Sequence, residues 1–136
     1  LQNRKCVFND DILNEILEEV YTADAIVLGT PSYFSDMTPE LKAFIDRAGV
    51  VALGNGKLFK HKIGAAVVAE RRGGGSSIQA SIHHMFLMSE MIIPGSTYWN
   101  FGFGCDKGEV ANDCEAMANM ENLGENICFL LDKLNK

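Results

Sequence analysis

The stretch "AIVLGTPSYFSDMTPELKAFIDR", residues 25–47, contains a predicted strand, a loop and the start of a helix. Its first seven residues form an apolar run ending in Gly-Thr-Pro, which favours a strand buried on both faces of a parallel sheet. Further along, Thr38 can cap a helix whose first residue is Pro39. The residues between them, with Tyr33 and Phe34 side by side, are therefore predicted to form a loop at the carboxyl end of the strand.

The same alternation of strand and helix continues along the chain. The predicted elements, in order, are a helix within 9–24 with Asn9 and Asp10 as caps, the strand and helix of 25–47, a strand at 62–70, a helix within 77–91 with Ser76 or Ser77 as cap, a strand at 91–96, and a helix from Asn112 onward. This order indicates one α/β domain over residues 1–136. Right-handed crossovers would build a parallel sheet with helices on both faces.

The composition limits the classes of partner. The 136 residues carry a net charge of −6, which argues against nucleic acid and anionic membranes as main partners. There is no apolar run long enough to span a bilayer and no secretory signal pattern at the start, so a cytoplasmic location is expected. The four cysteines have no CxxC spacing and suit reduced thiols better than a disulfide framework.

Three loops follow the predicted strands, at residues 30–37, 70–77 and 96–104. Ligands of such sheets bind beyond the carboxyl ends of the strands. Aromatic rings stack on planar ligands, so Tyr33 and Phe34, with Tyr98 or Trp99, suit a flat ring system. The alternative, that Tyr33 and Phe34 pack on neighbouring helices or at a subunit contact, remains open from spacing alone.

The loop at 70–77, "ERRGGGSS", combines glycines, arginines and a helix start. Glycines let the backbone approach a ligand, and the free N–H groups of a helix start favour electron-rich atoms. The loop matches neither the GxGxxG nor the Walker pattern, so dinucleotide and P-loop sites are disfavoured. A flexible linker is the alternative interpretation.

The sequence offers no hydrolytic or metal motif. His83 and His84 are adjacent within a predicted helix and point about 100° apart, so they cannot chelate one metal in the usual way. No Ser-His-Asp arrangement, paired carboxylates or HExxH spacing is present. We therefore predict no catalytic side chain and no metal ligand in this chain.

The run from Gly29 to Phe34, followed by "LKAFIDR" at 41–47, resembles the signature of the flavodoxin-like NAD(P)H-dependent FMN reductases, a group that includes iron-sulfur flavoproteins and tryptophan-repressor-binding-protein-type quinone reductases. The segments "KIGAAVVAERRGGGSS" and "MIIPGS" are similar to the next strand, flavin loop and following strand of that family. By this resemblance, two loops would contact the flavin ring. Their residues are Pro31, Ser32, Tyr33 and Phe34 on one side, and Glu70, Arg71, Arg72, Gly73, Gly74 and Gly75 on the other.

The resemblance implies an FMN-dependent oxidoreductase. Such a protein takes hydride from NAD(P)H and passes electrons to a quinone, flavin or similar small-molecule acceptor, usually as a homodimer or homotetramer. Arg71 and Arg72 would stabilise the negative charge of the reduced flavin. The alternatives are an electron-carrier flavodoxin without substrate turnover, which the "ERRGGG" loop disfavours, and a response-regulator-like signalling domain.

The chain departs from the family pattern at its start. A three-layer flavodoxin-like domain opens with a strand, a phosphate-binding loop, a helix and a second strand, and the resemblance here covers only the C-terminal two-thirds. We therefore expect the intact parent to bind FMN and this chain alone to bind it poorly. Cys6 takes the place of the last cysteine of the iron-sulfur flavoproteins, so a cluster is conceivable only in the intact parent, because one thiolate cannot hold it.

Overall fold

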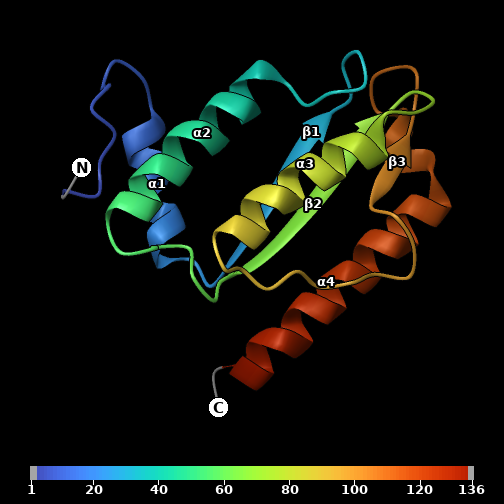
Figure 1. The fold of residues 1–136 in the computed structure, drawn as a ribbon. Coiled ribbons are helices and arrows are strands. Elements are labelled where there is room, and N and C mark those ends of the chain that lie inside the picture. The colour runs from blue at the N-terminus through green and yellow to red at the C-terminus, as the bar shows by residue number, and fades with distance from the viewer. Residues whose placement is uncertain (1–2, 135–136) are drawn as a thin grey trace.

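The computed structural model describes residues 3–134 as a parallel sheet with helices on both faces (Figure 1). The elements, in chain order, are α1 (Leu13–Thr22), β1 (Ala25–Pro31), α2 (Pro39–Gly54), β2 (Ile63–Glu70), α3 (Gly75–Met88), β3 (Phe101–Phe103), the 3-10 helix η1 (Glu109–Asn112) and α4 (Cys114–Leu134). The strands lie in the order β1-β2-β3 and all pairs are parallel. The predicted three-layer α/β architecture is confirmed.

The main core lies between the sheet and helices α1, α2 and α3. It includes Leu17, Val51, Ala66 and Phe86. The ring of Phe86 lies so close to Gly64 of β2 that a Cβ atom there would be 2.8 Å from it, which explains the small residues predicted for this strand. None of the described helices combines the length and apolarity needed to cross a membrane.

The prediction that residues 25–31 are buried on both faces is wrong. Ile26 and Leu28 are buried in the core, whereas Val27, on the other face, is 52% exposed. The reason is the position of α4, which packs over Gly102 and the β3 side of that face. An apolar groove of about 390 Å³ separates Gly29 of β1 from Met117 and the rest of α4.

The third strand is not where the sequence predicts it. Residues 91–96 contribute one isolated bridge, between Ile63 and Ile92, and regular pairing with β2 resumes at Phe101–Phe103. Pro94 lacks an N–H group and cannot continue the ladder, so the chain leaves the sheet and returns. The aromatic stretch predicted as loop thus supplies the strand, and the two segments together line one edge of β2.

The helix starts were predicted with mixed success. Thr38 caps α2 as expected, its side chain accepting a hydrogen bond from the N–H of Leu41 at 3.3 Å. The predicted serine caps of α3 are wrong, because the cap position is Gly74, with a left-handed φ of 105°. The helix N–H of Gly75 is accepted by the carboxylate of Glu70 at 2.6 Å, so a residue five positions earlier in sequence replaces the serine.

The other two helices start later than predicted. Asn9 and Asp10 do not cap α1; instead Asp11 accepts a hydrogen bond from the N–H of Leu13 at 3.1 Å. At the end of the chain, η1 precedes α4, and the carboxylate of Asp113 accepts from the N–H of Ala116 at 3.0 Å. In both cases the capping carboxylate lies a few residues after the predicted position.

Candidate functional site

The loop after β1 contains a tight turn with an unusual backbone. Tyr33 and Asp36 exchange two backbone hydrogen bonds, of 3.0 and 3.1 Å, around the central residues Phe34 and Ser35. Both central residues are left-handed, with φ values of 51° and 62°. Turns of this kind favour Asn-Gly, and a left-handed residue other than glycine costs about 1–3 kcal/mol. The chain therefore holds two strained residues at the carboxyl end of β1.

The loop is anchored on both sides of this turn. The side-chain oxygen of Thr30, which is buried in β1, accepts a hydrogen bond from the N–H of Thr38 at 3.1 Å. On the other side, the N–H of Ser32 donates to the carbonyl of Ala69 in β2 at 2.8 Å. These contacts fix the strained turn at a defined place on the sheet edge.

The two aromatic side chains of this loop point into solvent. Phe34 is fully exposed and Tyr33 is 62% exposed. Burial of aromatic rings is a main source of folding free energy, and within the described chain neither ring provides it. Packing on neighbouring helices does not account for this pair, which leaves a ligand or a subunit contact.

The glycine loop after β2 lies directly against the first loop. A Cβ atom on Gly74 would be 2.7 Å from Oγ of Ser32 and 2.8 Å from Cα of Ser35, so only glycine fits there. The hydroxyl of Ser32 donates to the carbonyl of Gly73 at 3.2 Å, and that of Ser77 donates to the carbonyl of Ser35 at 3.0 Å. The two loops therefore form one continuous surface, which we call the flavin ledge and define as residues 31–35 and 71–75.

The flavin ledge offers several free hydrogen-bond donors. Within residues 3–134, the backbone N–H groups of Arg71, Arg72, Gly73 and Gly74 have no acceptor. The first three residues are exposed, and Gly74 is half-buried. Glu70 differs, because it is 5% exposed and its carboxylate holds the first N–H of α3. The ledge thus combines donors with exposed rings, while Glu70 lies behind it.

The third loop lies on the other side of the glycine loop, because β2 is the middle strand. Tyr98 and Trp99 are exposed there, and Asn119 of α4 holds their backbone. Its amide donates to the carbonyls of Tyr98 and Trp99 at 3.2 and 2.9 Å, and its oxygen accepts from the N–H of Tyr98 at 2.8 Å. Sequence reasoning missed Asn119, although a polar residue between Ala116 and Leu123 on the buried stripe of a helix was a usable signal.

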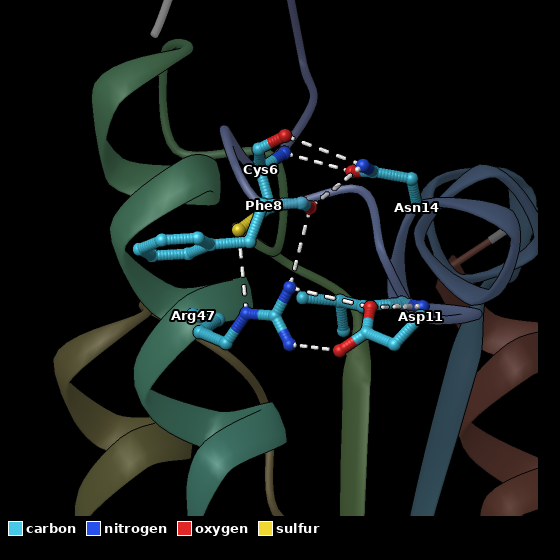
Figure 2. Close-up of polar contacts among 6 residues, drawn as sticks. Cys6, Phe8, Asp11, Asn14 and Arg47 are labelled. Atoms are coloured by element: carbon cyan, nitrogen blue, oxygen red, sulfur yellow. Dashed lines mark hydrogen bonds and ion pairs between the residues drawn. The ribbon is translucent and has the colours of Figure 1, made fainter.

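Cys6, the single candidate cluster ligand, lies in a polar network with Arg47 of α2 (Figure 2). The guanidinium Nε donates to its Sγ at 3.3 Å, and the same guanidinium binds the carboxylate of Asp11 and the carbonyl of Phe8. The amide of Asn14 pairs with the backbone of Cys6 on both sides. Hydrogen bonds from Arg47 and Leu13 lower the pKa of Asp11 and keep it charged.

The other three cysteines are exposed and distant in sequence. In the part of the chain that the structure describes, no group of three or more His, Cys, Asp or Glu side chains is arranged to hold a metal. The described residues alone therefore do not fit an iron-sulfur cluster, which needs about four thiolates.

Comparison with known proteins identifies the family. Residues 1–106 match the family described as NADPH-dependent FMN reductase. The chain belongs to this family. It is 32% identical to an iron-sulfur flavoprotein of Methanocaldococcus jannaschii, over 97% of this chain and 70% of that protein. It is 34% identical to a NAD(P)H dehydrogenase (quinone) of Trichlorobacter lovleyi, over 60% of this chain and 40% of that protein.

A solved structure supports the same assignment. The Trp repressor binding protein from Bacillus subtilis superposes with a TM-score of 0.71 at 21% identity, over 81% of this chain and 68% of that one. The fold is therefore flavodoxin-like, as predicted. Family membership also confirms the prediction of an FMN-dependent oxidoreductase with FMN and NAD(P)H as its cofactors, and it gives no support to the signalling-domain hypothesis.

Proposed function

We propose that this chain provides the ring-binding surface of an FMN site whose parent protein transfers electrons from NAD(P)H to a quinone, a flavin or a similar acceptor. The observation that carries the proposal is the flavin ledge, where a strained turn presents Phe34 beside unpaired N–H groups of the glycine loop. Strain of this kind persists at ligand-binding sites because the surrounding contacts enforce it.

The residues of the ledge fit the isoalloxazine ring chemically. Phe34 and Tyr33 are exposed rings on which a planar ring system can stack. The free N–H groups of residues 71–74 can donate to the oxygen and nitrogen atoms of its polar edge. Arg71 and Arg72, both exposed, would stabilise negative charge on that edge. When bound, FMN accepts a hydride from NAD(P)H and passes two electrons to an acceptor.

Flavin binding tests the ledge directly. Lumiflavin, which has the ring without the phosphate, and FMN would each be titrated into the chain while flavin fluorescence is recorded. We expect Phe34→Ala to weaken binding of both about tenfold, because a stacked ring is lost. The matched control is Phe129→Ala, which removes a phenyl ring of 59% exposure on α4. Equal effects of the two substitutions would refute the ledge as the ring site.

A second measurement separates a reductase from an electron carrier. NADPH would be added without oxygen to the flavin-loaded protein, extended upstream where the short chain retains too little FMN. Loss of the flavin absorbance, followed by its return on addition of a quinone, is expected for the reductase. The arginines of the glycine loop favour this outcome, because carriers crowd acidic residues around the flavin. An absorbance that NADPH leaves unchanged would favour the carrier.

Two finer predictions concern the intact protein. Cys6 is a candidate for one ligand of an iron-sulfur cluster, and iron and sulfide analysis of a protein extended upstream, with and without Cys6→Ser, tests this. Self-association as a homodimer or homotetramer is the other prediction. The exposed apolar side chains of Val50, Leu53, Leu87 and Met88 on α2 and α3 support it. Analytical ultracentrifugation of Met88→Lys would show whether this surface is involved.

A further inference from the structure

A cleft of about 310 Å³ lies beside the flavin ledge, between the glycine loop, the aromatic loop before β3 and the start of α4. Its volume is at the lower end of the range for small-molecule sites, which begins at about 300 Å³. The cleft is distinct from the outer surface of Tyr33 and Phe34, neither of which lines it. Its chemistry therefore needs a separate explanation.

One wall of the cleft is aromatic. Trp99 stacks on Phe101, with ring centroids 6.4 Å apart and planes within 17° of each other. Tyr98 is tilted by 57° against Trp99, at 6.2 Å. Asn119, itself 4% exposed, fixes the backbone of this loop, so the rings are held in place before any ligand binds. Such a wall suits a planar ligand.

The charged groups of the cleft are all acidic. Glu70, Asp113 and Glu115 line it, and no lysine, arginine or histidine does. The carboxylate of Asp113 accepts the backbone N–H groups of Ala116 and Phe103, both at 3.0 Å. These bonds lower its pKa, so Asp113 keeps its negative charge at neutral pH.

Glu70 gives the strongest indication of a ligand. It is 95% buried, and its Oε2 accepts the N–H of Gly75 at 2.6 Å. Within residues 3–134 no group donates to its Oε1. A buried carboxylate with a free oxygen is costly unless a cation or a donor approaches it. The cleft thus presents an incompletely paired carboxylate behind an aromatic wall.

We propose that this cleft binds a planar aromatic cation of the N-alkylpyridinium class, with its ring against Trp99 and Phe101 and its charge toward Glu70 and Asp113. Aromatic faces attract cations, and three carboxylates without a basic neighbour in the lining add to that attraction. An anionic ring of the same shape is repelled by the same groups. The proposal concerns binding alone and is independent of whether FMN occupies the flavin ledge.

Calorimetric titration of the chain with three bicyclic probes tests the proposal. The probes are 1-methylquinolinium, which is a cation, quinoline, which is neutral at pH 7.5, and the anion 2-naphthoate. We expect the cation to bind at least about tenfold more tightly than quinoline, and naphthoate not to bind. Binding of the cation should also change the emission of Trp99, the only tryptophan in the sequence. Equal affinity for the cation and quinoline, or no binding of the cation at millimolar concentration, would overturn the proposal.

Three substitutions locate the site. Trp99→Leu and Glu115→Gln should each weaken cation binding about fivefold, because one removes a ring face and the other an exposed charge. The matched control is Glu121→Gln, which removes an exposed charge from the same helix outside the cleft. A loss of affinity in Glu121→Gln equal to that in Glu115→Gln would show a general charge effect and contradict the assignment to this cleft.

Discussion

Left-handed residues other than glycine occur at both ends of the sheet, but their surroundings differ. At the amino end, Lys57, His61 and Glu90 have φ values of 62°, 67° and 58°. At the carboxyl end, Phe34 and Ser35 have 51° and 62°. The local backbone cost is similar at the two ends, about 1–3 kcal/mol per residue. What compensates for it is different.

The amino end pairs its polar groups within the chain. The N–H of His61 donates to the carbonyl of Glu90 at 2.9 Å, and the Glu90 carboxylate forms ion pairs with Lys57 and Lys60. Lys62 donates from its ammonium group to the last carbonyls of α1. This end therefore needs no ligand to explain its strain.

The carboxyl end leaves its groups unpaired. Phe34 is fully exposed, and within residues 3–134 the N–H groups of Phe34, Ser35 and the glycine loop have no acceptor. Backbone strain alone is thus a poor marker of a functional site in this protein. Strain together with exposed rings and free donors is the informative combination, and it occurs where the family binds its flavin.

The largest expected effect comes from Gly74→Ala. Its Cβ would lie 2.8 Å from Cα of Ser35, a backbone atom that cannot move cheaply, and its φ is 105°. We expect the free energy of unfolding in urea to fall by about 3 kcal/mol, from strain and overlap together. The control is Gly56→Ala near the amino end, where φ is 87° and no atom lies within 4 Å; its expected loss is about 1 kcal/mol. Equal losses would mean that the two loops of the ledge do not touch.

A smaller effect, of opposite sign, is expected for glycine at the strained turn. Ser35→Gly should raise the free energy of unfolding by about 0.5–1 kcal/mol and leave flavin affinity unchanged, because the ring of Phe34 stays in place. Phe34→Gly should raise stability similarly but weaken flavin binding. His61→Gly is the counterpart at the amino end, with a gain in stability and no effect on flavin. A loss of flavin affinity in His61→Gly would remove the distinction between the two ends.

The sequence predicted the carboxyl end better than the sheet around it. The strand, loop and helix of residues 25–47 have local chemical signals, including Thr38 and Pro39 at the helix start, and the structure confirms them. The turn at Phe34 and Ser35 was not predictable, because its residues lack the Asn-Gly signal of such turns. The contact between Gly74 and Ser35 joins residues 39 positions apart and has no local signal.

The failures elsewhere have the same cause. The start of α3 depends on Glu70, which reaches it only once β2 has formed. The exposure of Val27 depends on where α4 packs, and periodicity does not contain that information. The strand at Phe101–Phe103 replaced the predicted one because the partner that β2 offers extends past the residues that Pro94 interrupts. Long-range contacts decided each case.

The smallest expected effect concerns pH and the ion pairs of the amino end. Hydrogen bonds from Lys57 and then Lys60 lower the pKa of Glu90 from 4.5 to about 2. A lowered carboxyl pKa contributes stability above the ordinary pKa, and this contribution is lost as the pH falls from about 4.5 toward 2. Glu90→Gln should therefore lower the thermal midpoint slightly at pH 7 and match the wild type near pH 2. Glu121→Gln, an exposed carboxylate without an ion pair among the described residues, serves as control and should give a pH-independent difference. If Glu90→Gln also gave a pH-independent difference, the ion pairs would not offset the strain at Glu90, and the contrast between the two ends would rest on the backbone hydrogen bonds alone.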